Sequence, residues 1–343
     1  MTQSISYATA EPVPGNSRGG LIAMGVVSIV LGALAGCVAA LTPVGLIVQR
    51  MAPQQPVVAP PVASVVSGML IYVAVATALI WTGIGSCRCR RWCRAVVLVV
   101  AWPALVTGVL GVAALAAVLP AMSRTMAAAG APPGGAGMPQ GFFLGVMIGT
   151  VVASSVFYVG LPALYLWFYR RPQTKLTLDA LDPRPNWTDG RPLPVLGLSI
   201  WMAVAAAGTL SALAYGVAPL FGTFVTGPAA AVVLIAAAAA IAWGARQAYH
   251  VRAAGWWAAL AFAVLAPASW EITVGIRGLR PFYELAGFPV EQVDQIEQFQ
   301  GSAAWATIAF PLLSAALVVA FLIYARRFFF TAPAPGGASD VNA

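Results

Sequence analysis

The chain has 343 residues, of which 60% are hydrophobic and only 8% are charged, and its mean hydropathy is +0.86. Soluble domains average about 25% charged residues, so this composition excludes a water-soluble globular protein. Disordered chains are rich in charge and poor in apolar residues, which excludes extensive disorder. We therefore expect an integral membrane protein, in which the net charge of +8 sets the topology and does not indicate a nucleic-acid partner.

Apolar segments of about twenty residues can cross the roughly 30 Å of hydrocarbon in a bilayer. The sequence contains eight of them, at residues 21–48, 63–84, 95–121, 142–169, 195–218, 226–244, 254–275 and 304–324. The prediction is an all-α integral membrane protein with about eight transmembrane helices.

The spans divide into two groups of four. We expect a first four-helix membrane half at residues 21–171, a cytoplasmic linker at 172–194 and a second four-helix half at 195–327. Residues 1–20 and 328–343 are rich in small and polar residues and are predicted to be disordered cytoplasmic tails.

Basic residues between the spans predict the orientation, because cytoplasmic loops carry the excess of Lys and Arg. With both termini in the cytoplasm, fourteen of the eighteen Lys and Arg residues lie inside, and the four outside are Arg50, Arg124, Arg277 and Arg280. The triplet Asn186-Trp187-Thr188 is a formal glycosylation acceptor, but this topology places it on the unmodified face. The preference for Arg over Lys and the many Ala residues favour a bacterial inner membrane.

A weak internal repeat is present at a shift of 164 residues. It aligns a basic loop residue, an aromatic residue at the membrane interface and an intramembrane proline: Arg88 with Arg252, Trp92 with Trp256, and Pro103 with Pro267. If the chain arose by duplication, four spans per half give two tandem halves in parallel orientation, as in parallel-repeat transporters. Chance similarity is the alternative explanation.

Two sets of small residues at a spacing of four predict helix-packing faces, because small side chains let helix backbones approach closely in lipid. They are Ser28, Gly32 and Gly36 in the first span, and Gly141, Gly145 and Gly149 in the fourth. The abundance of glycine, 34 residues, is the competing explanation for both sets. Pro103 and Pro267 are candidate hinges, with ordinary helix kinks as the alternative.

A predicted cytoplasmic basic loop holds three of the four cysteines and consists of Cys87, Arg88, Cys89, Arg90, Arg91, Trp92, Cys93 and Arg94. The flanking arginines are expected to lower the thiol pKa values. A zinc site would need a fourth ligand such as His250, and Cys87 and Cys89 are closer in sequence than the usual zinc spacing. Acylation and an ordinary membrane-edge loop are the other interpretations, and we predict no metal and no cofactor.

Three further features leave alternatives open. Leu34-Ala35-Gly36-Cys37 resembles the cleavage site of bacterial lipoproteins, although the apolar run continues to Val48, which favours an uncut first span. Glu271 is an ionisable residue inside a span, either an interfacial carboxylate or a buried coupling site. Residues 290–297 alternate apolar and acidic positions with helical periodicity and are predicted to form an amphipathic helix at the outer surface.

The residue inventory argues against most enzymes. The chain has one His and one Lys, which excludes His-based metal triads and a P-loop. The first hypothesis is therefore a non-enzymatic interaction, accessory or assembly subunit, whose partners are the lipid bilayer and another membrane protein or a second copy. The alternative is a transporter or permease for a neutral or apolar solute, suggested by the repeat and by the two prolines.

Overall fold

The computed structural model describes residues 17–51, 61–128, 140–302 and 304–330. The described residues are 86% helical, and eight of their helical segments are long and apolar enough to cross a membrane. The prediction of eight apolar spans is thereby confirmed at the level of length and composition.

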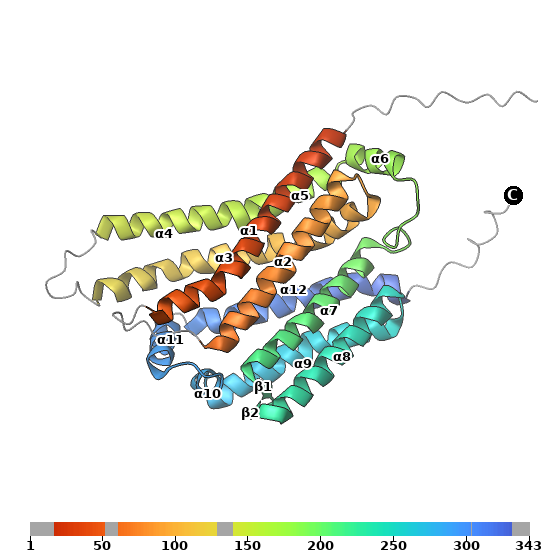
Figure 1. The fold of residues 1–343 in the computed structure, drawn as a ribbon. Coiled ribbons are helices and arrows are strands. Elements are labelled where there is room, and N and C mark those ends of the chain that lie inside the picture. Colours follow the sequence, from red (N-terminus) through yellow and green to blue (C-terminus); the bar gives the residue numbers. More distant parts are fainter. Residues whose placement is uncertain (1–16, 52–60, 129–139, 303, 331–343) are drawn as a thin grey trace, which may run out of the picture.

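The first half and the linker contain the following elements (Figure 1): α1 (Arg18–Met51), α2 (Val62–Cys87), α3 (Arg91–Ala128), α4 (Gln140–Ser155), the π-helix η1 (Val156–Gly160), α5 (Leu161–Arg170) and α6 (Pro172–Leu181). The helix α6 lies in the predicted linker. Because α1 already begins at Arg18, it includes the last residues of the predicted amino-terminal tail.

The second half contains α7 (Leu193–Ser211), the 3₁₀ helix η2 (Ala212–Tyr215), β1 (Val217–Leu220), β2 (Thr223–Thr226), α8 (Gly227–Tyr249), α9 (Ala253–Arg277), α10 (Arg280–Leu285), α11 (Val290–Ser302) and α12 (Ala304–Phe330). The helix α11 falls on the predicted amphipathic segment. Because α12 ends at Phe330, it extends into the predicted carboxy-terminal tail, and the rest of that tail lies outside the described residues.

The fourth span, predicted as an apolar segment at residues 142–169, is not one continuous α-helix. Residues 156–160 form a π turn between α4 and α5, and Pro162 lies at the start of α5. Pro162 has no backbone N–H and cannot donate to the carbonyl one turn earlier. The backbone hydrogen bonds therefore change at this point from the α-helical spacing of four residues to the π-helical spacing of five.

The helices α1 and α2 pack against each other through glycines. A Cβ atom added to Gly25 would lie 2.7 Å from the carbonyl oxygen of Gly83, and one added to Gly83 would lie 2.7 Å from the carbonyl oxygen of Gly25. A Cβ atom added to Gly32 would lie 2.7 Å from the side chain of Ile80. Only residues without a side chain allow this backbone approach, so the pair of helices is held at close range along several turns.

Tyrosines from α5 tie the fourth span to this helix pair. The hydroxyl of Ser28 donates to the Met24 carbonyl and that of Ser86 to the Leu21 carbonyl, which leaves each serine oxygen to accept from a tyrosine. Tyr165 donates to Ser28 at 2.6 Å and Tyr169 donates to Ser86 at 2.5 Å.

A short antiparallel hairpin, β1–β2, connects α7 to α8, with Val217 paired to Thr226 and Leu220 to Thr223. The two turn residues, Phe221 and Gly222, have φ values of 39° and 105°, and positive φ at both central residues suits the twist of a tight hairpin. The fifth span, predicted at about residues 195–218, ends with η2 at Tyr215, and a hairpin that was not predicted follows.

The turn between α2 and α3 has the same backbone structure as the turn between α8 and α9. Cys89 and Val251 have φ values of 51° and 56°, and each lies two residues after the end of its preceding helix. Four backbone hydrogen bonds repeat one for one at a shift of 162 residues; for example, Arg90 donates to Gly85 and Arg252 donates to Gln247. The expected shift of 164 residues is two residues too long here, so Pro103 and Pro267 are not at equivalent positions.

Burial follows the same shift of 162 residues. Four buried positions of α2 correspond to four buried positions of α8: Ala76 to Ala238, Thr82 to Gly244, Gly83 to Ala245, and Ser86 to Ala248. In the helices that follow, Arg94 Nε donates to the Tyr169 carbonyl of α5, and the equivalent Trp256 Nε1 donates to the Leu322 carbonyl of α12. In each of the two predicted halves, the third apolar helix is thus hydrogen-bonded to the fourth.

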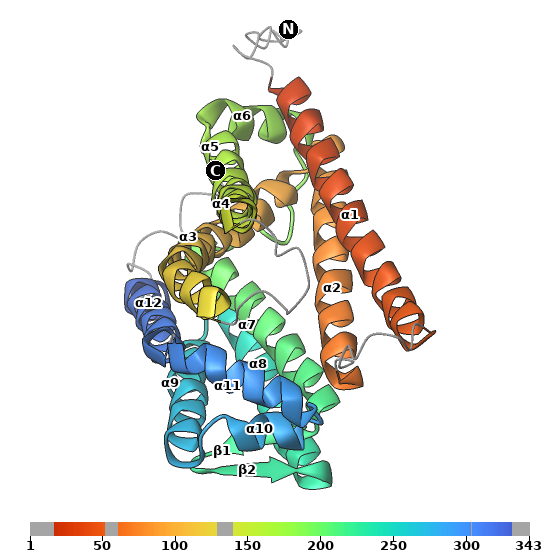
Figure 2. The ribbon, with the colours of Figure 1, turned by 90° about the vertical axis from the view of Figure 1, so that its left-hand side faces the viewer.

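Two views show how the elements are arranged. The helix α6 and the turn between α2 and α3 lie at one end of the molecule, and α10, α11 and the hairpin lie at the opposite end (Figures 1 and 2). The pair α1–α2 separates from α3 and α4 toward the second end, where Ser67 of α2 is hydrogen-bonded to Tyr215 of η2 at 2.9 Å. The helices α7 and α3 also meet where Trp201 Nε1 donates to the Val99 carbonyl at 3.0 Å.

Candidate functional site

The basic loop of the sequence analysis is divided between a turn and the first residues of α3. Arg88, Cys89 and Arg90 form the turn between α2 and α3, whereas Arg91, Cys93 and Arg94 belong to the first turn of α3. Asp182, at the end of α6, is buried beneath this segment, where it accepts from the backbone N–H of Arg91 at 3.2 Å and pairs with the Arg90 guanidinium at 3.4 Å. The linker is thereby attached to the start of α3.

The side chain of Arg91 makes two ion pairs with the linker. Its Nε lies 2.9 Å from a carboxylate oxygen of Asp179 in α6, and one of its terminal nitrogens lies 3.8 Å from a carboxylate oxygen of Asp189. A single arginine thus bridges two segments of the linker.

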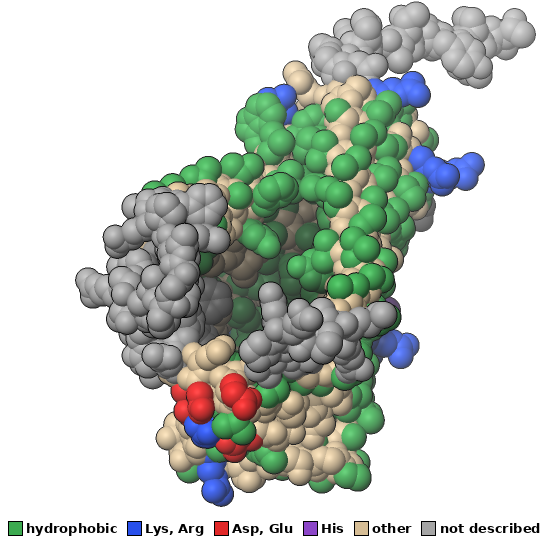
Figure 3. All heavy atoms as spheres, turned by 60° about the vertical axis from the view of Figure 1, so that its left-hand side comes forward, with side chains coloured by type: hydrophobic (Ala, Val, Ile, Leu, Met, Phe, Trp, Pro, Cys, Tyr) green, Lys and Arg blue, Asp and Glu red, His purple; other side chains and the backbone are tan. Residues whose placement is uncertain are grey.

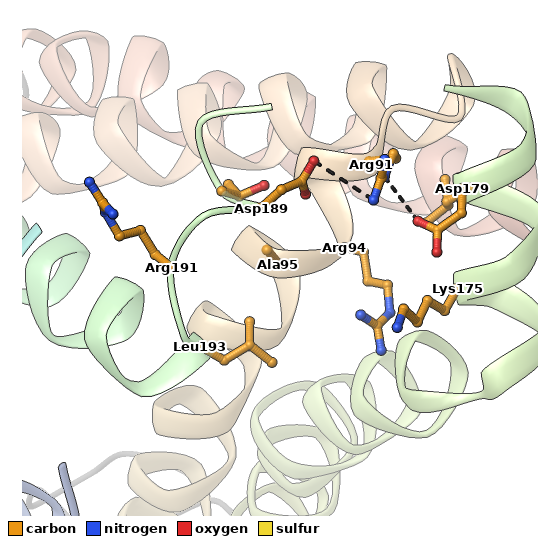
Figure 4. Close-up of a pocket in the computed structure, with 10 residues that line it drawn as sticks. Arg91, Arg94, Ala95, Lys175, Asp179, Asp189, Arg191 and Leu193 are labelled. Atoms are coloured by element: carbon orange, nitrogen blue, oxygen red, sulfur yellow. Dashed lines mark ion pairs between the residues drawn. The ribbon is translucent and has the colours of Figure 1, made fainter. Parts of the chain in front are cut away.

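A pocket of about 250 Å³ lies between the start of α3, α6 and the start of α7. Its ionisable lining consists of four cationic and two acidic residues: Arg91, Arg94, Lys175, Arg191, Asp179 and Asp189. Figure 4 shows Arg91 directed at both carboxylates, whereas the side chains of Arg94 and Lys175 lie beside each other, away from Asp189. The buried hydroxyl of Thr188 also lines the pocket and has no hydrogen-bond partner among the described residues.

The burial of the cysteines in this segment gives thiol pKa values that differ from the expected ones. Cys89 and Cys93 are buried, with 5% and 0% of their surfaces exposed, and Cys87 is half-buried. Burial raises the pKa of the Cys89 thiol; Arg18 opposes that shift, and the neighbouring Cys87 adds to it. The expected lowering of the thiol pKa is therefore wrong for Cys89, because desolvation outweighs the nearby positive charge. Within the described ranges, no group of three or more His, Cys, Asp or Glu side chains is placed to hold a metal ion.

The two predicted packing faces have different surroundings. On α1, Ser28 and Gly32 lie in the contact with α2 and α5, and a Cβ atom added to Gly36 would lie 3.8 Å from the Cβ of Ala76. On α4, a Cβ atom at Gly145 or Gly149 would meet nothing within 4 Å. Gly141 belongs to α4, but its surroundings lie outside the described part of the chain.

A second cavity, of about 370 Å³, lies between α3 and the fourth span. It is lined by Thr107, Gly108, Gly111, Val112, Leu115, Ser154 and Tyr158. Pro103 lies one turn before this cavity on α3, and Gly108 is in close contact with the carbonyl of Tyr158 in the π-helix.

The opposite end of the molecule carries the acidic row predicted at residues 290–297, on α11. Arg280 pairs with Glu284, Asp294 and Glu297 at 2.7, 3.0 and 3.0 Å, and these partners raise the pKa of its guanidinium. Acidic side chains gather at this end in Figure 3. Glu271 lies in α9, and its buried Oε1 has no hydrogen-bond partner among the described residues.

Several residues that matter in the structure were not singled out from the sequence. They are Gly25 and Gly83 in the closest helix contact, Tyr165 and Tyr169 in buried hydrogen bonds, and Lys175 in the basic pocket, whose Thr188 was noted only as part of a glycosylation triplet. Gly83 follows no regular small-residue spacing, so the sequence contains no sign of the helix contact. The linker, in contrast, combines the only lysine of the chain with three acidic residues and two arginines, and this cluster of charges could have indicated the basic pocket.

Comparisons were made with protein-family models, curated proteins and solved structures. None of the three finds a match for this chain. The inference of function therefore depends on the fold and on the sites described above.

Proposed function

We propose that the chain is a non-enzymatic accessory or assembly subunit of a bacterial inner membrane that binds another membrane-spanning helix through the outer face of α4. The observation that carries this proposal is the exposure of the fourth span. None of the residues in its most apolar window is buried within the chain, whereas the windows of the other seven spans are 11–33% buried.

The exposed face has the composition expected of a helix contact. Gly145, Gly149 and Ala153 are exposed and spaced four apart, and both glycines have open space beside them. Helices in lipid associate through such small residues because lipid itself competes with larger apolar side chains. A partner helix could approach the α4 backbone as closely as α2 approaches α1.

Leucine substitutions test this interface. Gly145→Leu and Gly149→Leu should release a partner protein, or dissociate a second copy, when the protein is extracted from native membranes in a mild detergent and its mass is measured. The matched control is Gly208→Leu in α7, which is also an open glycine in a span and has nothing within 4 Å. An unchanged mass for both α4 variants, or an equal loss with Gly208→Leu, contradicts the proposal.

A transporter or permease for a neutral or apolar solute is the second candidate, and the cavity between α3 and the fourth span favours it. The cavity is mostly apolar, and it adjoins both Pro103 and a π-helix, a feature frequently found at functional sites. Gly111 lines the cavity, and a Cβ atom added there would meet nothing within 4 Å, so Gly111→Leu should fill the space without disturbing the fold.

Flux measurements in vesicles separate the two functions. A transporter should lose solute flux with Gly111→Leu, and Pro103→Ala and Pro267→Ala should alter the flux while the protein remains folded. Unchanged flux in all three variants, for every solute tried, argues against transport.

The topology and the duplication belong to the same proposal. We place both termini in the cytoplasm, with the α6 end inside and the α10–α11 end outside. The repeated turn and the repeated burial pattern support a parallel duplication of a four-helix unit, in which α1, α2 and α3 correspond to α7, α8 and α9.

A further inference from the structure

We propose that the basic pocket bounded by α3, α6 and α7 is a binding site for a phosphate group, either that of an anionic lipid or that of a soluble phosphate. The inference does not depend on the proposed function, because it concerns the opposite end of the fourth span from the glycine face of α4. Its evidence is the charge of the lining, an unused buried hydroxyl and the position of the pocket.

The charges of the pocket lining do not balance. Both carboxylates, Asp179 and Asp189, are paired with Arg91. Arg94 and Lys175 form no ion pair within the described ranges, although Arg94 gives its Nε to the Tyr169 carbonyl. In Figure 4 these two cationic side chains lie beside each other, an arrangement that repels unless an anion binds to both.

A polar group in the same pocket is left without a partner. Thr188 is 4% exposed, and its hydroxyl makes no hydrogen bond within the described residues. A buried hydroxyl without a partner costs about 1–3 kcal/mol, so an unused one at a pocket wall indicates a bound group that accepts its hydrogen bond. A phosphate oxygen meets this requirement, and it also neutralises the two adjacent cations.

The location suits both sources of phosphate. Arg94 lies in the first turn of α3, Tyr169 lies near the end of α5, and α7 begins at Leu193, so the pocket lies where three spans end. Basic pockets between transmembrane helices on the cytoplasmic side are known to hold lipid headgroups. The pocket volume of about 250 Å³ accommodates a phosphate group without the acyl chains.

Thermal unfolding of the full-length protein in a neutral detergent tests the site. The two probes are sodium phosphate and short-chain phosphatidylglycerol, with sodium chloride of equal ionic strength and short-chain phosphatidylcholine as their controls. A ligand that binds the folded state raises the melting temperature in a concentration-dependent manner, which gives Kd. A rise with phosphate identifies a soluble source, and a rise with phosphatidylglycerol alone identifies a lipid; no rise above the controls with either probe overturns the proposal.

Three variants assign the effect to the pocket. Lys175→Gln should raise the Kd for the probe that binds at least about fivefold, as expected for the loss of one cation near a phosphate group. Thr188→Val should raise Kd without lowering the melting temperature of the unliganded protein, because the lost hydroxyl has no internal partner, and Thr188→Ser should restore binding. Arg184→Gln removes the same charge from the linker outside the pocket lining, and should change Kd less than twofold. Equal losses in Lys175→Gln and Arg184→Gln, with none in Thr188→Val, would show only general electrostatic attraction and would also overturn the proposal.

Discussion

Single side chains hold the fourth span to α1 and α2 through hydrogen bonds in an apolar environment. Tyr169 is fully buried, and Ser86 keeps its bond to the Leu21 carbonyl when the tyrosine hydroxyl is removed. We expect Tyr169→Phe to lower the free energy of unfolding by about 0.6 kcal/mol, and by no more than about 1.7, as measured for hydrogen bonds between membrane helices. Denaturant titration in detergent measures the change.

Tyr158→Phe is the matched control for this substitution. Tyr158 is 63% exposed, and its hydroxyl has no hydrogen bond in the described part of the chain. Its removal should leave the free energy of unfolding unchanged. If the two variants lose equal stability, the hydrogen bond from Tyr169 to Ser86 contributes nothing.

The reactivity of the cysteines provides a second prediction for individual residues. The pKa of Cys89 is raised by burial, so its thiolate forms at a higher pH than that of an ordinary thiol. In single-cysteine variants, a soluble maleimide should therefore modify the half-buried Cys87 faster than Cys89 at pH 7, and the rate for Cys89 should still be rising at pH 9. Faster modification of Cys89 at pH 7 would contradict the structure.

These residues show why sequence patterns alone predict neither the burial of a side chain nor the residue to which it is hydrogen-bonded. The arginines beside Cys89 were visible in the sequence, but the sequence does not show how deeply the thiol is buried, and burial determines the sign of the pKa shift. Tyr165 and Tyr169 likewise lie more than 80 positions from the serines that they contact. Only the folded arrangement identifies such pairs.

At the scale of helices, the contact between α1 and α2 provides the strongest prediction. A Cβ atom at Gly83 would lie 2.7 Å from a backbone carbonyl, which cannot rotate away as a side chain can. Gly83→Ala should therefore push the helices apart and lower the free energy of unfolding by about 1–3 kcal/mol, as overpacking does in protein cores. Thermal unfolding in detergent measures this.

Gly68→Ala on the same helix is the control. Nothing lies within 4 Å of a Cβ atom at Gly68, so the substitution should stabilise α2 by about 0.5–1 kcal/mol through the helix preference of alanine. Stabilisation by both substitutions would mean that α1 and α2 do not meet at Gly83.

The eight apolar helices were predictable because a segment that crosses a bilayer needs about twenty apolar residues, and all eight predicted segments overlap apolar helical segments of the structure. The irregular elements were not. The π turn at 156–160 depends on Pro162 and on its neighbours, and the hairpin at 217–226 is too short to produce a periodic signal. The glycine spacing predicted a packing face on α4, but not that this face stays open in the monomer.

At the scale of the whole molecule, charge is distributed unequally between the two ends. The α10–α11 end carries Arg277 and Arg280 together with four acidic residues, Glu284, Glu291, Asp294 and Glu297. The α6 end carries the excess of arginine. By the positive-inside rule, this distribution supports the proposal that α6 lies in the cytoplasm.

Reporter fusions test this orientation. Green fluorescent protein joined after Ala343 should be fluorescent, and alkaline phosphatase at the same position should be inactive, because the latter folds only outside the cytoplasm. Alkaline phosphatase inserted after Gly287, between α10 and α11, should be active. The reverse pattern would invert the predicted topology.

The hairpin between α7 and α8 has a mechanical consequence for the second half. Its turn N–H groups at Phe221 and Gly222 donate to the hydroxyls of Ser269 and Thr273 on α9, and Ser269 donates back to the carbonyl of Pro219. Where water is scarce, these bonds have no ready replacement, so sliding of α9 against the hairpin would break several at once. The segment from the hairpin to α9 should therefore move as one rigid body. Any large motion of the protein should then occur at the contacts that α2 and α3 make with η2 and α7.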